Sequence, residues 1–229
     1  MRVYLAVEDM EPNHWIAWAL NLPGCFSSAT TAEDAVALAP QKITEYFSWL
    51  LAHDSQLPAV QEPIEVEAVE TFYSFPCSED PEYIVNAFFD DDRRSLEYWD
   101  VEMGLRLLSW TRQDLFSAIQ SLTKEQLTKA ISGEVRGSIN GILNHIATAE
   151  NWYFDQLGYG VERENLPGDP LEKLAIVRTN TRNQLVKLIG NKLITKNCDE
   201  LWSARKILRR TLWHEQDHVR QIAQLRRSL

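Results

Sequence analysis

Residues 214–218, His-Glu-Gln-Asp-His, carry the clearest chemical pattern in the sequence. They fit the spacing H-E-x-x-H, in which two histidines on one helical face bind zinc and the glutamate activates a water molecule. A site of this kind requires a third ligand. The residues after His218 include no His, Asp, Glu or Cys, so a third ligand has to come from earlier in the chain.

The other three histidines differ in their surroundings. His14 lies beside a turn and His53 at the end of a predicted helix, and we expect both at the surface. His145 lies in the middle of a predicted helix with apolar residues at helical spacing, so it is expected to face the interior. Taken alone, this position suits either a core histidine bonded to a neighbouring helix or a metal ligand.

The pair on the last helix favours the metal. His214 and His218 are four residues apart, which places their Cβ atoms about 5 to 6 Å apart on one face. Two imidazoles there can share a metal at about 2.0 to 2.1 Å. Inward imidazoles without a shared ligand leave polar nitrogens unsatisfied, at about 1 to 3 kcal/mol each. The sequence therefore predicts one divalent metal ion (Zn, Ni or Fe) bound by His145, His214 and His218.

The residues between the paired histidines then need another role. Consecutive helical residues are about 100° apart, so Glu215 and Asp217 point to the two flanks of the ligand face. We expect Glu215 to be solvated or to support a ligand, and not to act as a base; the match to a peptidase motif is then coincidental. Asp217 is expected either to orient a neighbouring group or to form a surface salt bridge.

Aromatic and basic residues near the predicted ligands are candidates for a substrate pocket. Trp152 and Trp213 could wall such a pocket, although tryptophans at helical spacing also suit core packing. Four arginines could attract a carboxylate-bearing substrate or lie as solvated surface charges: Arg178, Arg182, Arg209 and Arg210.

The helices that position these residues follow from hydrophobic periodicity and capping signals. Helices are predicted over residues 100–122, 138–157, 170–189 and 203–226, with Ser138 and Ser203 as N-caps and Gly158 and Gly190 as C-terminal stops. Four amphipathic helices of similar length indicate a four-helix bundle.

The first part of the chain has a different pattern. Strands are predicted over residues 2–7, 14–22 and 64–74, and a helix capped by Thr31 runs to about residue 53, with Pro40 kinking or delaying it. The fold class is thus α+β. The predicted domains are residues 1–76, a connector over 77–96, and a bundle over 97–229.

Composition limits the partners and the location. Residues 1–100 contain 4 Lys and Arg against 19 Asp and Glu, whereas residues 101–229 contain 19 against 14. The acidic first half disfavours nucleic acid. No apolar run is long enough for a membrane span, and the N-terminus lacks the pattern of a signal peptide. Three widely spaced cysteines without a C-x-x-C pair predict reduced packing residues. We expect a cytoplasmic protein, a homodimer without nucleic-acid or membrane partners.

Two resemblances add to these predictions. The stretches SINGILNHIATAENWYFDQLG and SARKILRRTLWHEQDHVRQI are similar to the second and fourth helices of DinB/YfiT-like metal-binding bundles. That likeness covers residues 95–229 and implies His145, His214 and His218 as the metal ligands. The stretch WIAWALNLPGCFSSATTAEDAVALAPQKI resembles the HicB-like domain, which implies an interaction or regulatory module, although no DNA-binding appendage of an antitoxin follows it.

Two classes of function stay open. The DinB-like family includes mycothiol-dependent maleylpyruvate isomerase and other thiol-dependent transferases, so the resemblance implies a metal-dependent transferase or isomerase that acts on a small molecule with a low-molecular-weight thiol. The alternative is a non-catalytic, metal-stabilised interaction protein with a HicB-like module.

Overall fold

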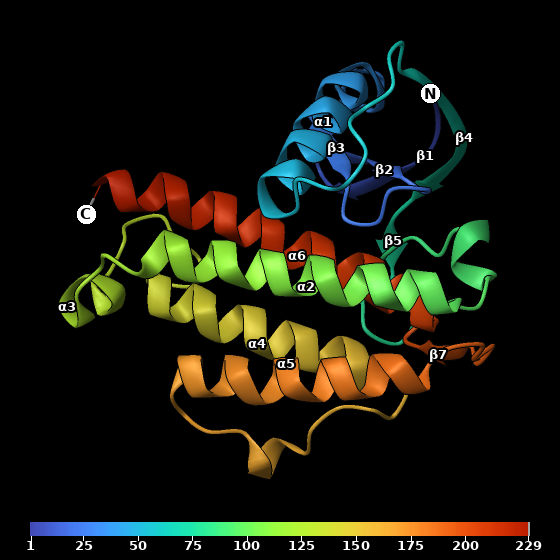
Figure 1. Cartoon of the computed structure of the whole chain (residues 1–229). Coiled ribbons are helices and arrows are strands. Elements are labelled where there is room, and N and C mark those ends of the chain that lie inside the picture. The colour runs from blue at the N-terminus through green and yellow to red at the C-terminus, as the bar shows by residue number, and fades with distance from the viewer. Residues whose placement is uncertain (229) are drawn as a thin grey trace. The chain divides into compact units, whose positions relative to one another are not determined.

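The computed structural model describes residues 1–228, and the chain divides into two units (Figure 1). Unit 1 contains Met1–Arg94 and Lys196–Trp202, and unit 2 contains Ser95–Thr195 and the chain from Ser203 onward. Residues 77–94, which the sequence assigns to a connector, thus belong to unit 1. A short segment between two bundle helices also belongs to it, and no local pattern in the sequence indicates this.

Unit 1 is built on a four-stranded sheet with the order β3-β2-β1-β4. The strands β1 and β2 pair antiparallel, as do β2 and β3, whereas β4 lies parallel to β1. The strands expected in the first part of the chain are present, together with a short one, β3, that the sequence did not predict. The strands are β1 (Arg2–Glu11), β2 (His14–Ala19), β3 (Phe26–Ala29) and β4 (Glu65–Tyr73).

A single helix, α1 (Ala32–His53), packs against this sheet through residues at helical spacing, among them Ala35, Ala39, Ile43 and Phe47. Thr31 caps the helix as predicted, accepting a hydrogen bond from the backbone N–H of Asp34 at 3.1 Å. The expected delay at Pro40 is absent, because α1 begins at Ala32 and continues through the proline.

Short elements complete unit 1. The strands β5 (Phe75–Pro76) and β6 (Ile84–Val85) pair with each other and are followed by the 3-10 turn η1 (Asp90–Arg93). The strands β7 (Thr195–Asn197) and β8 (Glu200–Trp202) form a second pair. Polar contacts join the turn between β7 and β8, and β8 itself, to the earlier segment; one of them runs from the Asn86 N–H to Glu200 at 3.2 Å. Ser78 donates from both its hydroxyl and its backbone N–H to Asp199, and the Tyr83 hydroxyl donates to Glu200 at 2.6 Å.

A disulfide joins Cys77 to Cys198, which are 121 residues apart in the sequence. The prediction of three reduced cysteines is therefore wrong for this pair, whereas Cys25 is buried and outside the disulfide, as expected. The wide spacing of the cysteines in the sequence suggested that they are reduced, but a disulfide needs proximity in the fold and not in the sequence. Together with the contacts of Ser78 and Tyr83, this bond anchors the β7–β8 segment within unit 1.

Unit 2 is a bundle of four long helices, which run side by side in Figure 1. All four predicted helices are present, within a few residues of the expected ends. They are α2 (Tyr98–Ile119), α4 (Ile139–Asp155), α5 (Pro170–Lys187) and α6 (Ala204–Leu225); shorter elements are α3 (Lys124–Thr128), η2 (Arg163–Asn165) and η3 (Arg226–Ser228).

The core of unit 2 is apolar at one end and ionic further along. Leucine, isoleucine and alanine side chains from α2, α4, α5 and α6 form the apolar cluster, with Leu115, Ile142, Ile146, Leu174 and Ile222 at its centre. Ser138 and Ser203 cap α4 and α6 as predicted. Among the described residues no helix is long and apolar enough to cross a membrane.

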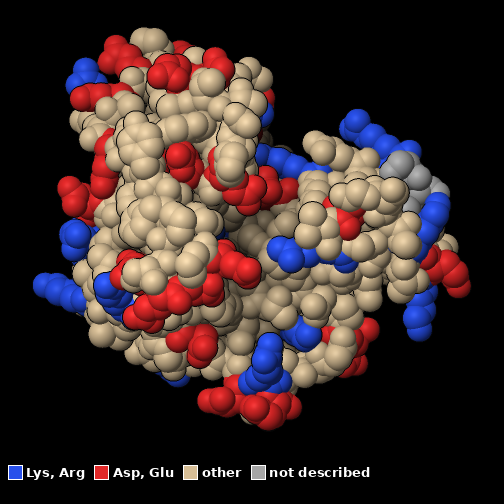
Figure 2. Space-filling model, turned by 180° about the vertical axis from the view of Figure 1, so that it is seen from behind, with Lys and Arg blue, Asp and Glu red and all other residues tan. Residues whose placement is uncertain are grey.

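The surface reflects the uneven charge of the sequence. Most acidic side chains of unit 1 are exposed, whereas side chains of both signs lie over unit 2 (Figure 2). Several of the charged residues of unit 2 are missing from this surface because they are buried in the bundle.

Candidate metal centre

The helix α4 places His145 at the margin of its buried face. Ser138 caps the helix by accepting a hydrogen bond from the Gly141 N–H at 3.1 Å, and the buried residues that follow recur at helical spacing. His145 lies one turn beyond Gly141 and is half-buried. Its ring contacts His214 of the neighbouring helix α6, and the residue stays partly exposed to solvent.

The helix α6 supplies the other two histidines from one face. Ser203 caps this helix at the Lys206 N–H, 3.2 Å away. His214 is only 7% exposed, whereas His218, one turn later, is half-buried. The four-residue spacing thus gives one imidazole inside the bundle and a second one at its rim.

The three imidazoles converge through their Nε2 atoms. Nε2 of His214 lies 3.1 Å from Nε2 of His145 and also 3.1 Å from Nε2 of His218. The ligand atoms of all three lie within 4.8 Å of one another. Nitrogens bound to one metal at about 2.0 to 2.1 Å with angles near tetrahedral are roughly 3.0 to 3.4 Å apart, so two of the three separations already suit a shared ion.

A glutamine fixes the tautomer of His218. Nε2 of Gln221 donates to Glu134 at 2.9 Å, and this bond orients the amide so that its oxygen accepts from Nδ1 of His218 at 2.6 Å. A neutral His218 that carries its proton on Nδ1 has a lone pair on Nε2. Glu134 and Gln221 thus direct that lone pair toward His214, as supporting residues do for metal-binding histidines.

Hydrogen bonds account for only one of the two close contacts of His214. Since Nε2 of His218 is an acceptor, its contact with His214 needs the single proton that Nε2 of His214 can carry. That proton is then not available for His145, which is equally close. Nε2 of His145 faces the guanidinium of Arg136 at 3.2 Å instead, so no proton bridges its close approach to His214. The donor set is therefore better matched by one cation than by hydrogen bonds.

The electrostatic environment keeps these histidines neutral at pH 7. Burial, together with the charges of Arg136 and His218, lowers the pKa of His145 to about 4. Burial, followed by the neighbouring histidines, holds the pKa of His214 well below its usual range. Burial also lowers the pKa of His218, against the opposing effect of its bond to Gln221. All three can therefore offer lone pairs to a metal at neutral pH.

Aromatic rings and an arginine lie beside His214. The ring of Tyr153 is 5.9 Å from that of His214, and the guanidinium of Arg210 lies 4.5 Å above the ring of Trp213. Trp213 is buried, as a wall residue would be, whereas Trp152 is 37% exposed. The pocket-wall role predicted for these two tryptophans stays a prediction.

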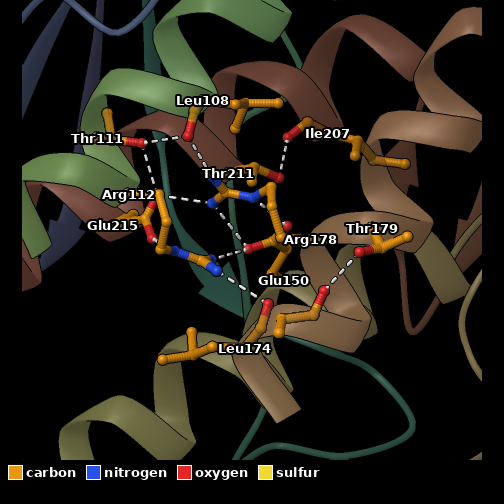
Figure 3. A network of polar contacts seen from close by, with 11 residues as sticks. Leu108, Thr111, Arg112, Glu150, Leu174, Arg178, Thr179, Ile207, Thr211 and Glu215 are labelled. Carbon is orange, nitrogen blue, oxygen red and sulfur yellow. Dashed lines mark hydrogen bonds and ion pairs between the residues drawn. The ribbon is translucent and has the colours of Figure 1, made fainter. Parts of the chain in front are cut away.

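Four charged residues form a buried network that includes Glu215, the neighbour of His214 in the sequence. Each of the four comes from a different helix (Figure 3). Glu150 of α4 accepts from Arg178 of α5 at 2.8 and 3.0 Å and from Arg112 of α2 at 3.1 Å. Glu215 of α6 accepts from Arg112 and Arg178, each at 2.6 Å. The hydroxyl of Thr111 adds a further bond to Glu215 at 2.6 Å. None of the four charged side chains is more than 10% exposed.

The network excludes the solvated alternative for Glu215 and both alternatives for Arg178, a solvated surface charge and a substrate-attracting one. Glu215 is not solvated, because it is 1% exposed and both of its carboxylate oxygens are bonded. Burial alone raises its pKa, but the charges of Arg178 and Arg112 outweigh burial and hold the pKa below its usual range. Arg178 in turn is buried against Glu150 and Glu215, so it is not exposed to attract a substrate. A glutamate held in this way does not serve as a water-activating base.

The two carboxylates and two guanidiniums balance in charge, and each has partners on other helices. Because a buried unpaired charge is costly, the network favours an alignment of the four helices in which all four charges are paired. Glu150 follows His145 on α4, and Glu215 is adjacent to His214 on α6. The network thus aligns the two helices that carry the histidines.

The structure brings together the three histidines predicted from the sequence, and this group includes neither His14 nor His53. Both of those histidines are half-buried and not fully at the surface. Asp217 is half-buried too, and its charge raises the pKa of His218.

Three residues beside the histidines were not predicted from the sequence: Glu134, Arg136 and Gln221. Glu134 and Arg136 lie in the loop that precedes α4, where no periodic pattern indicates a contact. Gln221 could have been predicted, because it follows His218 by three residues on the same helix.

Comparison with known proteins agrees with the bundle. Residues 103–185 match the sequence profile of the DinB family, a stretch that contains His145 and ends before α6. No curated protein and no solved structure matches the chain.

Proposed function

We propose that unit 2 binds one divalent metal ion through His145, His214 and His218, and that this centre serves a transferase or isomerase reaction that uses a low-molecular-weight thiol. The observation that carries the proposal is the convergence of the Nε2 atoms of three neutral imidazoles, in which no proton bridges the contact of 3.1 Å between His145 and His214. The match of residues 103–185 to the DinB family supports it, because members of that family generally bind metals.

The donor set suits a borderline metal such as zinc, nickel or iron, since imidazole accepts all of them. Three neutral ligands leave at least one coordination position for another group and leave the charge of the ion uncompensated. A divalent ion in this setting lowers the pKa of a thiol or water that reaches it. The protein side chains contribute by holding the three imidazoles neutral and aligned, through Gln221 on one side and the buried network on the other.

Metal content tests the ligand assignment. Protein prepared without chelator is expected to contain about one metal ion per chain, and His214→Ala should abolish this. His53→Ala is the matched control, because His53 lies in unit 1 and bonds its own helix at the Trp49 carbonyl. Equal loss of metal in the two variants would refute the assignment.

Cobalt substitution tests the use of a thiol. Sulfur coordination to Co(II) produces an intense band in the near ultraviolet, so added glutathione, cysteine, mycothiol or bacillithiol should produce this band in the cobalt protein if one of them is the physiological thiol. The band should strengthen as the pH rises toward the thiol pKa of about 8.5, because coordination releases a proton. If none of the four thiols changes the spectrum, the thiol-dependent function is wrong.

A second candidate function is a metal-stabilised interaction protein without catalysis. The placement of the ligands favours it. His145 lies on α4, whereas His214 and His218 lie on α6, so one ion would cross-link the two helices. On this account chelation lowers the thermal stability of unit 2, while thiols leave the cobalt spectrum unchanged. The cobalt experiment therefore distinguishes the two functions.

A further inference from the structure

Arg136 lies beside the three histidines, although it is not on the bundle helices. Its guanidinium contacts Nε2 of His145 at 3.2 Å, while the rest of the residue is exposed. It belongs to the loop between α3 and α4, and its charge contributes to the lowered pKa of both His145 and His214. A cation thus lies next to the proposed metal ligands, on the side that faces solvent.

The loop holds this arginine in place. Backbone hydrogen bonds close it from Ile131 to Gly137 at 2.8 Å and from Gly137 to Glu134 at 2.9 Å, and the side chain of Glu134 accepts from the Arg136 N–H at 2.9 Å. The first turn of α4 approaches so closely that a Cβ at Gly141 would lie 1.9 Å from the Arg136 carbonyl oxygen. The position of Arg136 is therefore fixed by the fold around it.

A second cation approaches from inside the bundle. Arg210 precedes His214 by one turn of α6, is 8% exposed, and lies over the rings of Trp213 and Tyr153 at 4.5 and 5.8 Å. Its charge also contributes to the lowered pKa of His214. Arg136 and Arg210 thus both act as positive charges on His214, whereas Asp217 and Glu134 act as negative charges on His218.

A metal would change the bonding of Arg136. The Nε2 lone pair of His145, which now faces the guanidinium, would be taken by the ion, and a guanidinium has no lone pair with which to bind a metal. Because Arg136 is exposed, its N–H groups would then be available to water or to another acceptor beside the ion. A carboxylate supplies two coplanar oxygens, which suit both a metal and the paired donors of a guanidinium.

We infer that the centre binds a small carboxylate, and that Arg136 is the residue that selects for its negative charge. This inference rests on the metal site proposed above and names the class of molecule that would react with the thiol there. The charges of Arg136 and Arg210 offset those of Glu134 and Asp217. With three neutral imidazoles, the divalent ion then leaves the centre positive, which favours an anionic ligand over a neutral one of the same size. Arg136 donates hydrogen bonds to the bound anion, and the positive charge of the buried Arg210 attracts the anion without contacting it.

Titration of the cobalt-loaded full-length protein tests this role. Acetate is the anionic probe and imidazole the neutral one, each followed in the visible spectrum of the ion at constant ionic strength and a pH near 8. In Arg136→Gln the affinity for acetate should fall about tenfold or more, the loss expected for a hydrogen bond between two charged groups. Imidazole affinity and cobalt content should remain within about twofold of the wild-type values.

Arg163→Gln is the matched control, since Arg163 is an exposed arginine of the same unit, in η2. It should leave both affinities unchanged. An unchanged acetate affinity in Arg136→Gln, or an equal loss for acetate and imidazole, would overturn the inference while the metal site stands. Failure of the wild-type protein to bind cobalt would instead refute the proposed function, and this inference with it.

Discussion

The buried network in unit 2 makes a quantitative prediction for Glu150→Gln. The substitution keeps the size of the side chain but removes one of two carboxylates that face two guanidiniums. Glu150 makes three contacts of 2.8 to 3.1 Å with Arg178 and Arg112, and its side chain is 3% exposed. Loss of one partner from a buried ion pair costs about 3 to 5 kcal/mol. Glutamine retains one oxygen acceptor, so we expect a loss of about 3 kcal/mol in the free energy of unfolding.

Urea unfolding followed by circular dichroism at 222 nm measures this loss, because the four long helices of unit 2 dominate the signal. The control Glu102→Gln changes an exposed carboxylate of α2 and should shift the unfolding free energy by no more than about 0.5 kcal/mol. Adding Arg112→Met to Glu150→Gln restores the balance of charge, leaving the pair of Arg178 and Glu215. The double variant should therefore lose less stability than the sum of the two single variants.

Two results would refute this reasoning. A loss below about 1 kcal/mol in Glu150→Gln would mean that the site relaxes or admits water and does not depend on paired charges. Additive effects of Glu150→Gln and Arg112→Met would mean that the two residues act separately.

The remaining predictions concern the support of the centre and the β7–β8 segment. Gln221→Leu should weaken zinc binding about 10- to 100-fold in equilibrium dialysis, because His218 loses the bond that orients it; unchanged affinity would exclude this supporting role. Cys77→Ser should lower the unfolding free energy by about 2 to 5 kcal/mol, and dithiothreitol should lower the melting temperature of the wild type but not of this variant; a reductant-insensitive wild type would contradict the disulfide. Hydrogen bonds from Lys196, and then from Ser78, lower the pKa of Asp199. The stabilisation from this carboxylate is therefore present above the pKa of 3.8 that it has in the unfolded chain, and it is lost as the pH falls through its pKa in the folded protein. Carboxyl NMR titration should show that the pKa rises in Lys196→Met, and an unchanged value would refute the contact.

The sequence predicted the bundle helices and the three histidines because both depend on local spacing. The helices follow from apolar periodicity and from serine caps, as at Ser138 and Ser203. The histidine pair follows from four-residue spacing, and His145 from its central place in a predicted helix. These features survive in the fold because neighbouring helices pack along the faces that the periodicity defines.

The corrected features depend on contacts between distant residues. Helical geometry places Glu215 about 100° from His214, but it does not show that α2 and α5 present arginines on that side. The β7 and β8 strands have three residues each, too short for a clear alternation. Cys77 and Cys198 become neighbours only when this segment joins unit 1. In each case the partner lies on another element, where a periodic pattern carries no information.

The most direct test of the metal centre is anomalous diffraction from crystals of the zinc-loaded protein, recorded on both sides of the zinc absorption edge. The account predicts one strong anomalous peak per chain, about 2.0 to 2.1 Å from Nε2 of each of His145, His214 and His218. A peak at any other group of side chains, or three histidines without a peak in crystals grown with zinc, would contradict it.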